Sequence, residues 1–513
     1  MTTEMQSPMR AAESAPQQPQ SSSPTKKLTL SEKLGYGVGD MANGLALAST
    51  AFYLLFYLTN VVRLSPELAG AALMVGRLWD AITDPVMGWI TDRTNTRWGK
   101  RRPYLLFGAI GYGASFFLLW TIPAFSSEAM TFLYVALILI LFNTLMTVVF
   151  IPYQTLTASM TNDYNERTSL TGYRMVLSQI AFLIGATVPA IIVGWNSTPA
   201  AQELLGRLPF AEAWGSWAGS DRQGYFLFAA LFMLLIVAAV WTSFAFTREE
   251  ISNEEPQQLS GSPLGYVREL IKLVSTNRIF RCSLLIKLLS TCAATIVSAK
   301  LQYYVTYVLG RQEDFSSIIG SLFVAAIFAI PFWVWLSKRL GKIIAYQIGS
   351  YGYCIVLFVL LVSGKDASSF IFLIAVAAGV FHSAALLIPW TIIPDVVEVD
   401  EYNQGIRREG LLYGGTTFAY KLGSGLSIFI AGLVLASLGF DPDSASSEDL
   451  TSGILLSVTV IPIGLFLLSI LAARRYELTA ERHSEIVAEL KRRRDSTART
   501  STRGTDSLLR DGK

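Results

Sequence analysis

Two carboxylates lie one helical turn apart in an apolar segment that is long enough to cross a membrane, in the stretch WDAITDPVMGWITD at residues 79–92. An ionised side chain inside a bilayer is energetically expensive and normally faces a partner or a watery cavity. Asp80 and Asp84, with neutral oxygens from Thr83 and Thr147, would bind a small monovalent cation such as sodium. Alternatively, mutual repulsion of the two carboxylates would let one of them carry a proton.

Basic side chains in other apolar segments could balance these acids. Arg77 shares a helix face with Asp80 and Asp84, because residues three, four and seven apart lie above one another. The remaining charges in apolar segments are Asp40, Arg174, Lys287, Lys300 and Lys421. A purely structural role, in which acids and bases neutralise each other, is the alternative for Arg77 and Arg174. In a functional role, Lys421 would link cation occupancy to substrate occupancy through the charge balance of one cavity.

Composition places the chain among helical membrane proteins. Of its 513 residues, 52% are hydrophobic and 15% are charged, whereas a soluble domain carries about 25% charged residues. The apolar runs have the length of roughly 20 residues that a membrane-spanning helix needs, and they are too continuous for the alternating strands of a barrel. The net charge of +3 gives no reason to expect a nucleic acid as a partner.

Hydropathy, together with the positions of Gly, Pro and charges, predicts an all-α membrane protein with twelve transmembrane helices in two six-helix bundles. The expected spans are 34–60, 66–91, 103–123, 129–155, 170–195, 224–247, 279–308, 316–337, 342–363, 369–392, 410–438 and 452–473. The expected domains are a disordered cytoplasmic N-terminus (1–33), an N-terminal bundle (34–247), a cytoplasmic linker with an amphipathic helix (248–278), a C-terminal bundle (279–473) and a basic cytoplasmic tail (474–513).

Basic loops set the expected orientation. DRTNTRWGKRRP, TNDYNERTS, SKRLGK and NQGIRRE all lie on the side shared by both termini, so both termini should be cytoplasmic. A basic, glycine-bearing turn follows the second span and again the eighth, which indicates two related bundles, as in secondary transporters. We expect a multi-pass protein of the cell membrane (plasma or inner), surrounded by membrane lipid and acting as a monomer.

Enzymatic chemistry finds little support in the sequence. The chain has two histidines, His382 and His483, and lacks a zinc-binding HExxH, a paired-cysteine motif, a phosphate-binding glycine loop and a nucleophile elbow. We therefore expect no enzyme activity and no organic cofactor. A non-transporting receptor is disfavoured because Asp80, Asp84 and Lys421 are all present.

Several motifs together resemble one transporter family over residues 34–475. The motifs are GYGVGDMANGL, GRLWDAITDPVMGWITDRTNTRWGKRRP, IPYQTLTASMTNDYNERTSLTGYR, PDVVEVDEYNQGIRREGLLYGG and YKLGSG. They resemble the major facilitator superfamily, and within it the glycoside–pentoside–hexuronide:cation symporters typified by melibiose permease. The resemblance implies the major facilitator fold and cation-coupled symport of a sugar or glycoside by alternating access.

The resemblance also implies roles for individual residues. The cation ligands would be Asp80, Asp84, Thr83 and Thr147, with sodium or a proton as the coupling ion. The substrate-binding and coupling positions would be Asp40, Asn43, Phe150, Gln154, Arg174 and Lys421. The gating positions would be Arg77, Asp92, Arg93 and Arg101.

Three positions depart from the family's sugar-binding pattern. Gly44 and Phe150 stand where melibiose permease has the aspartates that hold the sugar, and Gln154 stands in place of a tryptophan. Losing both carboxylates removes the acceptors that sugar hydroxyls need. The alternative substrate is therefore a lysophospholipid or another amphiphile, as in the vertebrate lysolipid symporters of the same branch, to which the chain also looks similar.

Overall fold

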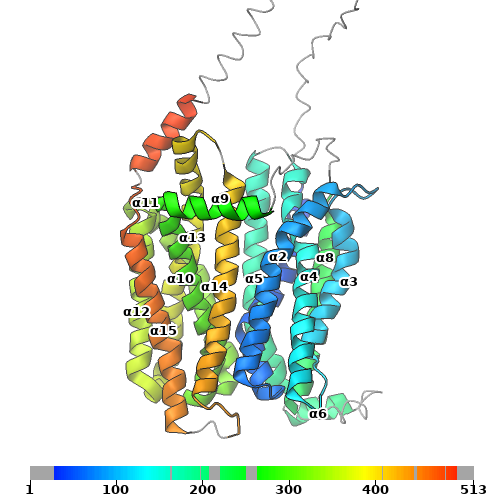
Figure 1. Ribbon diagram of the computed structural model, residues 1–513. Coiled ribbons are helices and arrows are strands. Elements are labelled where there is room, and N and C mark those ends of the chain that lie inside the picture. The colour runs from blue at the N-terminus through cyan, green and yellow to red at the C-terminus, as the bar shows by residue number, and fades with distance from the viewer. Residues whose placement is uncertain are drawn as a thin grey trace, which may run out of the picture.

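Twelve long helices run between the two ends of the molecule and make up most of the described chain (Figure 1). The computed structural model describes residues 28–161, 164–196, 198–206, 220–249, 263–406, 408–443, 447–479 and 481–493. The long helices are α1 (Leu30–Phe56), α2 (Pro66–Arg93), α3 (Arg102–Trp120), α4 (Glu128–Met160), α5 (Tyr164–Asn196), α8 (Ser220–Phe246), α10 (Arg278–Tyr303), α11 (Phe315–Leu340), α12 (Lys342–Ser363), α13 (Ile371–Gln404), α14 (Glu409–Ser437) and α15 (Glu448–Arg474). These ranges contain no β-strand, and the predicted all-α class is confirmed.

The helices are long and apolar enough for the predicted membrane spans. Ten stretches of the described chain meet both conditions, and one of them contains both α12 and α13. The charged helix α2 is not among the ten, but its 28 residues extend about 42 Å, more than the roughly 30 Å of a bilayer's hydrocarbon core. The charges of α2 therefore lower its mean hydropathy, but the helix is still long enough to span the hydrocarbon core.

Most predicted boundaries lie within a few residues of the observed ones, and α13 is the main exception. It continues to Gln404, well past the expected end at 392. Val396 and Val397 in this extension are each 1% exposed, because they pack in a cluster with Leu273 of α9 (Pro263–Thr276) and Phe280 of α10. Hydropathy detects only the apolar, membrane-spanning part of such a helix, so the predicted end at 392 comes before the observed end at Gln404.

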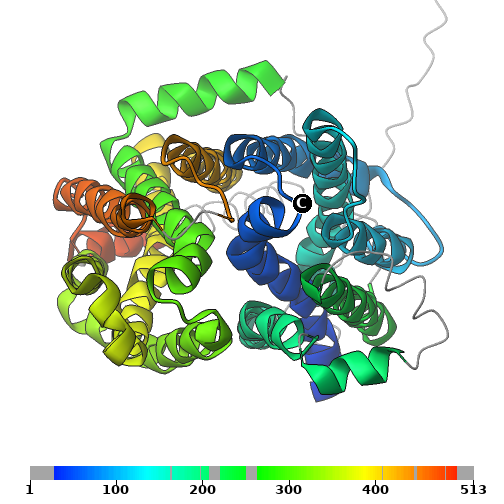
Figure 2. The same ribbon diagram turned by 90° about the horizontal axis from the view of Figure 1, so that it is seen from below.

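The long helices form two groups that lie side by side (Figure 2). The first bundle contains α1 to α5 and α8, and the second contains α10 to α15. The bundles meet where α2 packs on α14, α1 on α10, and α5 on α11. We call this inter-bundle boundary the seam.

Aromatic and polar contacts close the seam at the end opposite α9. Helices α1 and α10 both end here in a π-helical turn, Tyr57–Val61 and Tyr304–Val308, and the two turns share Tyr, Thr and Val in YLTNV and YVTYV. Thr59 Oγ1 lies 2.6 Å from Tyr303 OH, and the rings of Phe56 and Tyr303 are 5.2 Å apart. We call this region the closed end.

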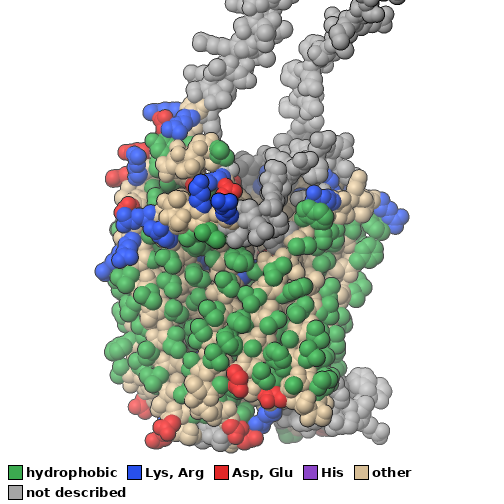
Figure 3. Space-filling model, viewed as in Figure 1, with side chains coloured by type: hydrophobic (Ala, Val, Ile, Leu, Met, Phe, Trp, Pro, Cys, Tyr) green, Lys and Arg blue, Asp and Glu red, His purple; other side chains and the backbone are tan. Residues whose placement is uncertain are grey.

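Charged side chains are sorted along the bundle axis. In the face drawn in Figure 3, hydrophobic side chains cover the middle of the molecule, while Lys and Arg gather at the end that carries α9. Helix α9 runs across the bundle axis at that end (Figure 1). This is the distribution expected for a protein that crosses a bilayer.

Glycines allow α2 and α14 to approach closely at the seam. A Cβ added at Gly425 would lie 2.9 Å from Arg77 Cβ, and one added at Gly432 would collide with Pro66 O and lie 3.1 Å from Gly70 Cα. Small residues at such positions let transmembrane helices pack backbone to backbone.

We expect Gly432→Val to destabilise the purified protein by about 1–3 kcal/mol, the usual effect of overpacking, as measured by thermal unfolding in detergent. Gly464→Val on α15 is the matched control, because an added Cβ there meets no atom within 4 Å. Equal unfolding temperatures for the two variants would contradict the close α2–α14 contact.

Candidate functional site

The charges of α2 and α14 form one ion-pair cluster at the seam. Helix α2 places Asp80 and Asp84 one turn apart. Lys421 Nζ of α14 lies 2.8 Å from Asp80 Oδ2 and also forms an ion pair with Asp84 Oδ2. Arg77 packs beside Gly425 of α14. Because the acids belong to the first bundle and the amine to the second, these ion pairs join the two bundles.

Two threonine hydroxyls lie against the carboxylates. Thr147 Oγ1 of α4 is 3.1 Å from Asp80 Oδ1 and 3.0 Å from Asp84 Oδ1. Thr83 Oγ1 is 3.4 Å from Thr147 Oγ1 and 3.3 Å from the Asp80 carbonyl oxygen. A hydroxyl has one proton and two lone pairs, so Thr147 donates to one carboxylate at a time and keeps lone pairs available for a cation.

Most of this cluster is shielded from solvent. Asp80 is 1% exposed, Thr147 2% and Lys421 8%, while the Asp84 side chain is 22% exposed. The three ion-paired groups, two carboxylates and one ammonium, carry one net negative charge, apart from Arg77 one turn earlier on α2, and a net charge is unfavourable in a low-dielectric interior. One monovalent cation or one proton would neutralise it. In the part of the chain that the structure describes, no group of three or more His, Cys, Asp or Glu is placed to hold a metal ion.

A second charged pair lies within the first bundle. Arg174 Nε of α5 is 3.8 Å from Asp40 Oδ2 of α1, and Asp40 is 7% exposed. Beside them, the Tyr36 and Tyr153 rings stack with centroids 4.9 Å apart. This pair joins α1 to α5 and is separate from the ion pairs of the α2–α14 cluster.

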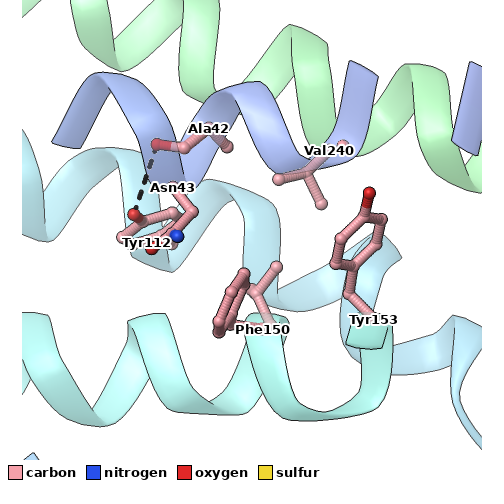
Figure 4. A pocket seen from close by; sticks show the side chains of 8 residues that line it. Ala42, Asn43, Tyr112, Phe150, Tyr153 and Val240 are labelled. Atoms are coloured by element: carbon pink, nitrogen blue, oxygen red, sulfur yellow. Dashed lines mark hydrogen bonds between the residues drawn. The ribbon is translucent and has the colours of Figure 1, made fainter. Parts of the chain in front are cut away.

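The predicted substrate residues do not all come together. Asn43 and Phe150 line a small pocket between α1, α3, α4 and α8, where Tyr112 OH donates to the Ala42 carbonyl (Figure 4). The pocket measures about 10 Å³, close to the minimum for one water. Gln154 is exposed and does not line it.

Gly44 serves the packing of α1 on α5. A Cβ at this position would lie 2.7 Å from Ser178 O and 3.0 Å from Ala181 Cβ. A carboxylate could therefore not be restored at Gly44 without separating the two helices. Phe150 instead packs against Tyr153, with ring centroids 6.3 Å apart.

Three predicted gating residues lie at the end of α2 and in the loop after it: Asp92 and Arg93 are in the last turn of α2, and Arg101 is in the loop. The Arg93 guanidinium stacks on the Trp89 ring at 4.1 Å, and the backbone N–H of Arg101 donates to Glu249 Oε2, just beyond α8, at 3.0 Å. The side chain of Asp92 lies outside the described residues. The Arg101–Glu249 hydrogen bond joins the loop to its own bundle.

Two features of the structure received no role from the sequence: Lys287 in the second bundle and the closed end of the seam. Lys287 of α10 is 4% exposed, and its ammonium lies 4.2 Å from the centre of the Trp390 ring and 5.6 Å from that of Tyr420. Its neighbours come from α13 and α14, so no spacing along one helix could have revealed them. The closed end could have been anticipated from the repeated YxTxV of residues 57–61 and 304–308.

Comparisons with known proteins agree with this architecture. Residues 35–480 match the sequence model of the MFS/sugar transport protein family. An uncharacterized symporter of Synechocystis sp. is 30% identical, over 92% of this chain and 98% of its own. Sodium-dependent lysophosphatidylcholine symporter 1 of Gallus gallus is 30% identical, over 91% of this chain and 90% of its own.

A solved structure shows the same fold. It is a bacterial homologue of the human lysosomal transporter Spinster in an inward-facing and occupied conformation, which matches with a TM-score of 0.62 and 14% identity over 87% of this chain and 96% of that chain. The twelve helices thus have the major facilitator arrangement. The chain belongs to the MFS/sugar transport protein family and is a multi-pass membrane symporter, not an enzyme.

Proposed function

We propose that the α2–α14 cluster is where this symporter binds its coupling cation and links it to the substrate. The observation that carries the proposal is that Lys421 of one bundle is paired with Asp80 and Asp84 of the other. Any charged ligand that binds at the seam changes the electrostatic balance among these three groups. Binding of one ligand therefore changes the affinity for the other, which is what coupling requires.

Coupling follows from competition for the two carboxylates. Without a cation, Lys421 serves as the partner of both Asp80 and Asp84. A monovalent cation bound between them cancels the remaining negative charge and weakens the hold of the acids on the ammonium. Lys421 then becomes available to a hydroxyl or an anionic group of a substrate bound between the two bundles, which we call the central site.

Sodium is the proposed coupling ion. Hard cations prefer oxygen ligands, and Thr83 and Thr147 add hydroxyl oxygens beside the two carboxylates. The sodium dependence named for the lysophosphatidylcholine symporter supports the same choice. A proton is the alternative, because a carboxyl group of the pair could carry it.

A sugar or glycoside is the first substrate class, in line with the family match. Asp40, Asn43 and Arg174 would approach it from the first bundle, with Phe150 and Gln154 at its margin. The second class is a lysophospholipid or another amphiphile. The apolar wall at Phe150 and the 30% identity to a lysophosphatidylcholine symporter favour it.

The closed end is proposed to face outward. Lys and Arg gather at the opposite end (Figure 3), which the positive-inside rule assigns to the cytoplasm together with both termini. The protein would then be an inward-facing monomer in the cell membrane, enclosed by lipid. Asp92, Arg93 and Arg101 would join the bundles on the cytoplasmic side in the outward-facing state. Arg77 does not fit this role, because it lies between Asp80 and the outward end of α2 and already packs beside Gly425 of α14.

We expect Asp84→Asn to lower cation-driven accumulation of substrate in proteoliposomes by about tenfold or more, because losing a charged ligand weakens binding by more than the 1.4 kcal/mol that corresponds to tenfold. The measurement uses a glycoside and a lysophosphatidylcholine, each driven separately by a sodium gradient and by a pH gradient. Accumulation driven by the pH gradient alone would reassign the coupling ion to the proton.

Asp366→Asn is the matched control, because Asp366 is an exposed acid at the closed end, in η4 (Gly364–Phe370). This variant should accumulate substrate like the wild type. Full accumulation by Asp84→Asn would show that the cluster does not bind the driving ion.

Lys421→Met should make the protein less stable without sodium and more responsive to it. Removing one partner of a buried ion pair costs about 3–5 kcal/mol, and the two unpaired carboxylates should then bind sodium without competition. Thermal unfolding is measured against sodium chloride, with choline chloride matching the ionic strength. Lys338→Met, at an exposed position of α11, is the control. If sodium raises the unfolding temperature of both variants equally, Lys421 does not compete with the cation.

A further inference from the structure

We propose that Lys287, enclosed by Trp390 and Tyr420, is a subsite for an anionic group of the transported substrate, either a phosphate or a carboxylate. The inference rests on the proposed function, because it places this group in the central site that Lys421 also serves. It narrows the substrate to solutes that carry such a group.

Three helices of the second bundle build the subsite. Lys287 comes from α10, Trp390 from α13 and Tyr420 from α14. The Trp390 and Tyr420 rings meet edge to face, with centroids 5.6 Å apart and planes at 79°. The Lys287 ammonium lies near both rings, at 4.2 Å and 5.6 Å from their centres. This arrangement fixes the position of the ammonium.

The subsite has a positive charge but no ion-pair partner in the described ranges. Lys421 is paired with two carboxylates, whereas the structure pairs Lys287 with aromatic rings only. Burying an ammonium without an anion is unfavourable, and a cation–π contact offsets only about 2 kcal/mol of this. A bound phosphate or carboxylate would provide the missing charge.

The subsite is adjacent to the coupling cluster. Tyr420 directly precedes Lys421 and is close enough to Asp80 and Asp84 to interact with their charges. Trp390 is 39% exposed, so the subsite reaches the surface of the packed helices. A substrate that meets Lys421 can therefore extend an anionic group to Lys287.

The opposite wall suits the rest of such a substrate. In the first bundle, Phe150 lies beside Asn43, and Asp40 is paired with Arg174. The Asp40–Arg174 pair has no net charge, so these residues offer apolar surface, an amide and an internally balanced ion pair, whereas the second bundle offers the ammonium groups of Lys287 and Lys421. A solute with a neutral or apolar body and one anionic group matches both walls.

The test uses two pairs of probes that differ mainly in an anionic group. They are nitrophenyl glucuronide against nitrophenyl glucoside, and oleoyl-lysophosphatidic acid against monooleoylglycerol. Binding to the purified full-length protein is measured by thermal stabilisation in sodium chloride and in choline chloride, and uptake is measured in proteoliposomes. The wild type should bind the anionic member of at least one pair about tenfold or more tightly, as expected for a hydrogen bond to a charged group.

Lys287→Met should reduce this preference to less than about threefold, and Lys287→Arg should keep most of it because the charge is retained. Lys338→Met, an exposed lysine on α11, should behave like the wild type. If Lys287→Met does not fold, Lys287→Gln takes its place and should lose the preference in the same way, because it also removes the charge.

Two outcomes would overturn the subsite. In one, the wild type binds both members of each pair equally, and in the other Lys287→Met keeps the full preference. Equal binding that still depends on sodium would leave the symport proposal standing. If no probe binds in either salt, both the subsite and the proposed substrate classes fail.

Discussion

An ammonium buried between two carboxylates, where two helix bundles meet, is the interaction on which the rest of the structure depends. In a low-dielectric interior none of the three charges is stable alone, so the positions of α2 and α14 are tied to one another by Lys421, Asp80 and Asp84. The glycines at Gly425 and Gly432 follow from this constraint, because the two backbones must come close enough for the amine to reach both acids. Thr147 then fixes α4 against the same carboxylates.

The closed end shows how such a seam can also be released. Its contacts are a hydroxyl pair between Thr59 and Tyr303, aromatic rings from α1 and α10, and an ion pair of Arg63 with Asp443. The two charged side chains are half or more exposed, so their charges return to water when the bundles separate. The aromatic and hydroxyl contacts come from residues in or directly before the two π-helical turns, at equivalent ends of α1 and α10. Buried ion pairs are thus found at the α2–α14 cluster, whereas hydroxyl, aromatic and solvent-exposed ionic contacts join the bundles at the closed end.

Hydropathy predicted most of the helix bounds because a bilayer imposes a fixed apolar length on each span. It failed at the end of α13, where packing of Val396 and Val397 continues the helix beyond the predicted span.

The spacing of Asp80 and Asp84 predicted a shared helix face, but their pairing with Lys421 depends on the contact between two helices that are distant in the sequence. Gly44 indicated a lost carboxylate, whereas the structure gives it a packing role against α5. The environment of Lys287 is built by three helices, so no local pattern could reveal it.

The division of charges between the bundles suggests how a symporter prevents its ion from crossing the membrane without the substrate. The first bundle supplies the acids and the second supplies Lys421, so the empty protein contains its own ion pairs across the seam and can change conformation without a ligand. In the proposed mechanism, a cation bound at Asp80 and Asp84 would loosen the hold of these acids on Lys421 and leave an ammonium at the seam that lacks a full partner. Such a charge would oppose closure of the bundles around it. A substrate that meets the ammonium would remove this obstacle, and the ion would then cross together with its substrate.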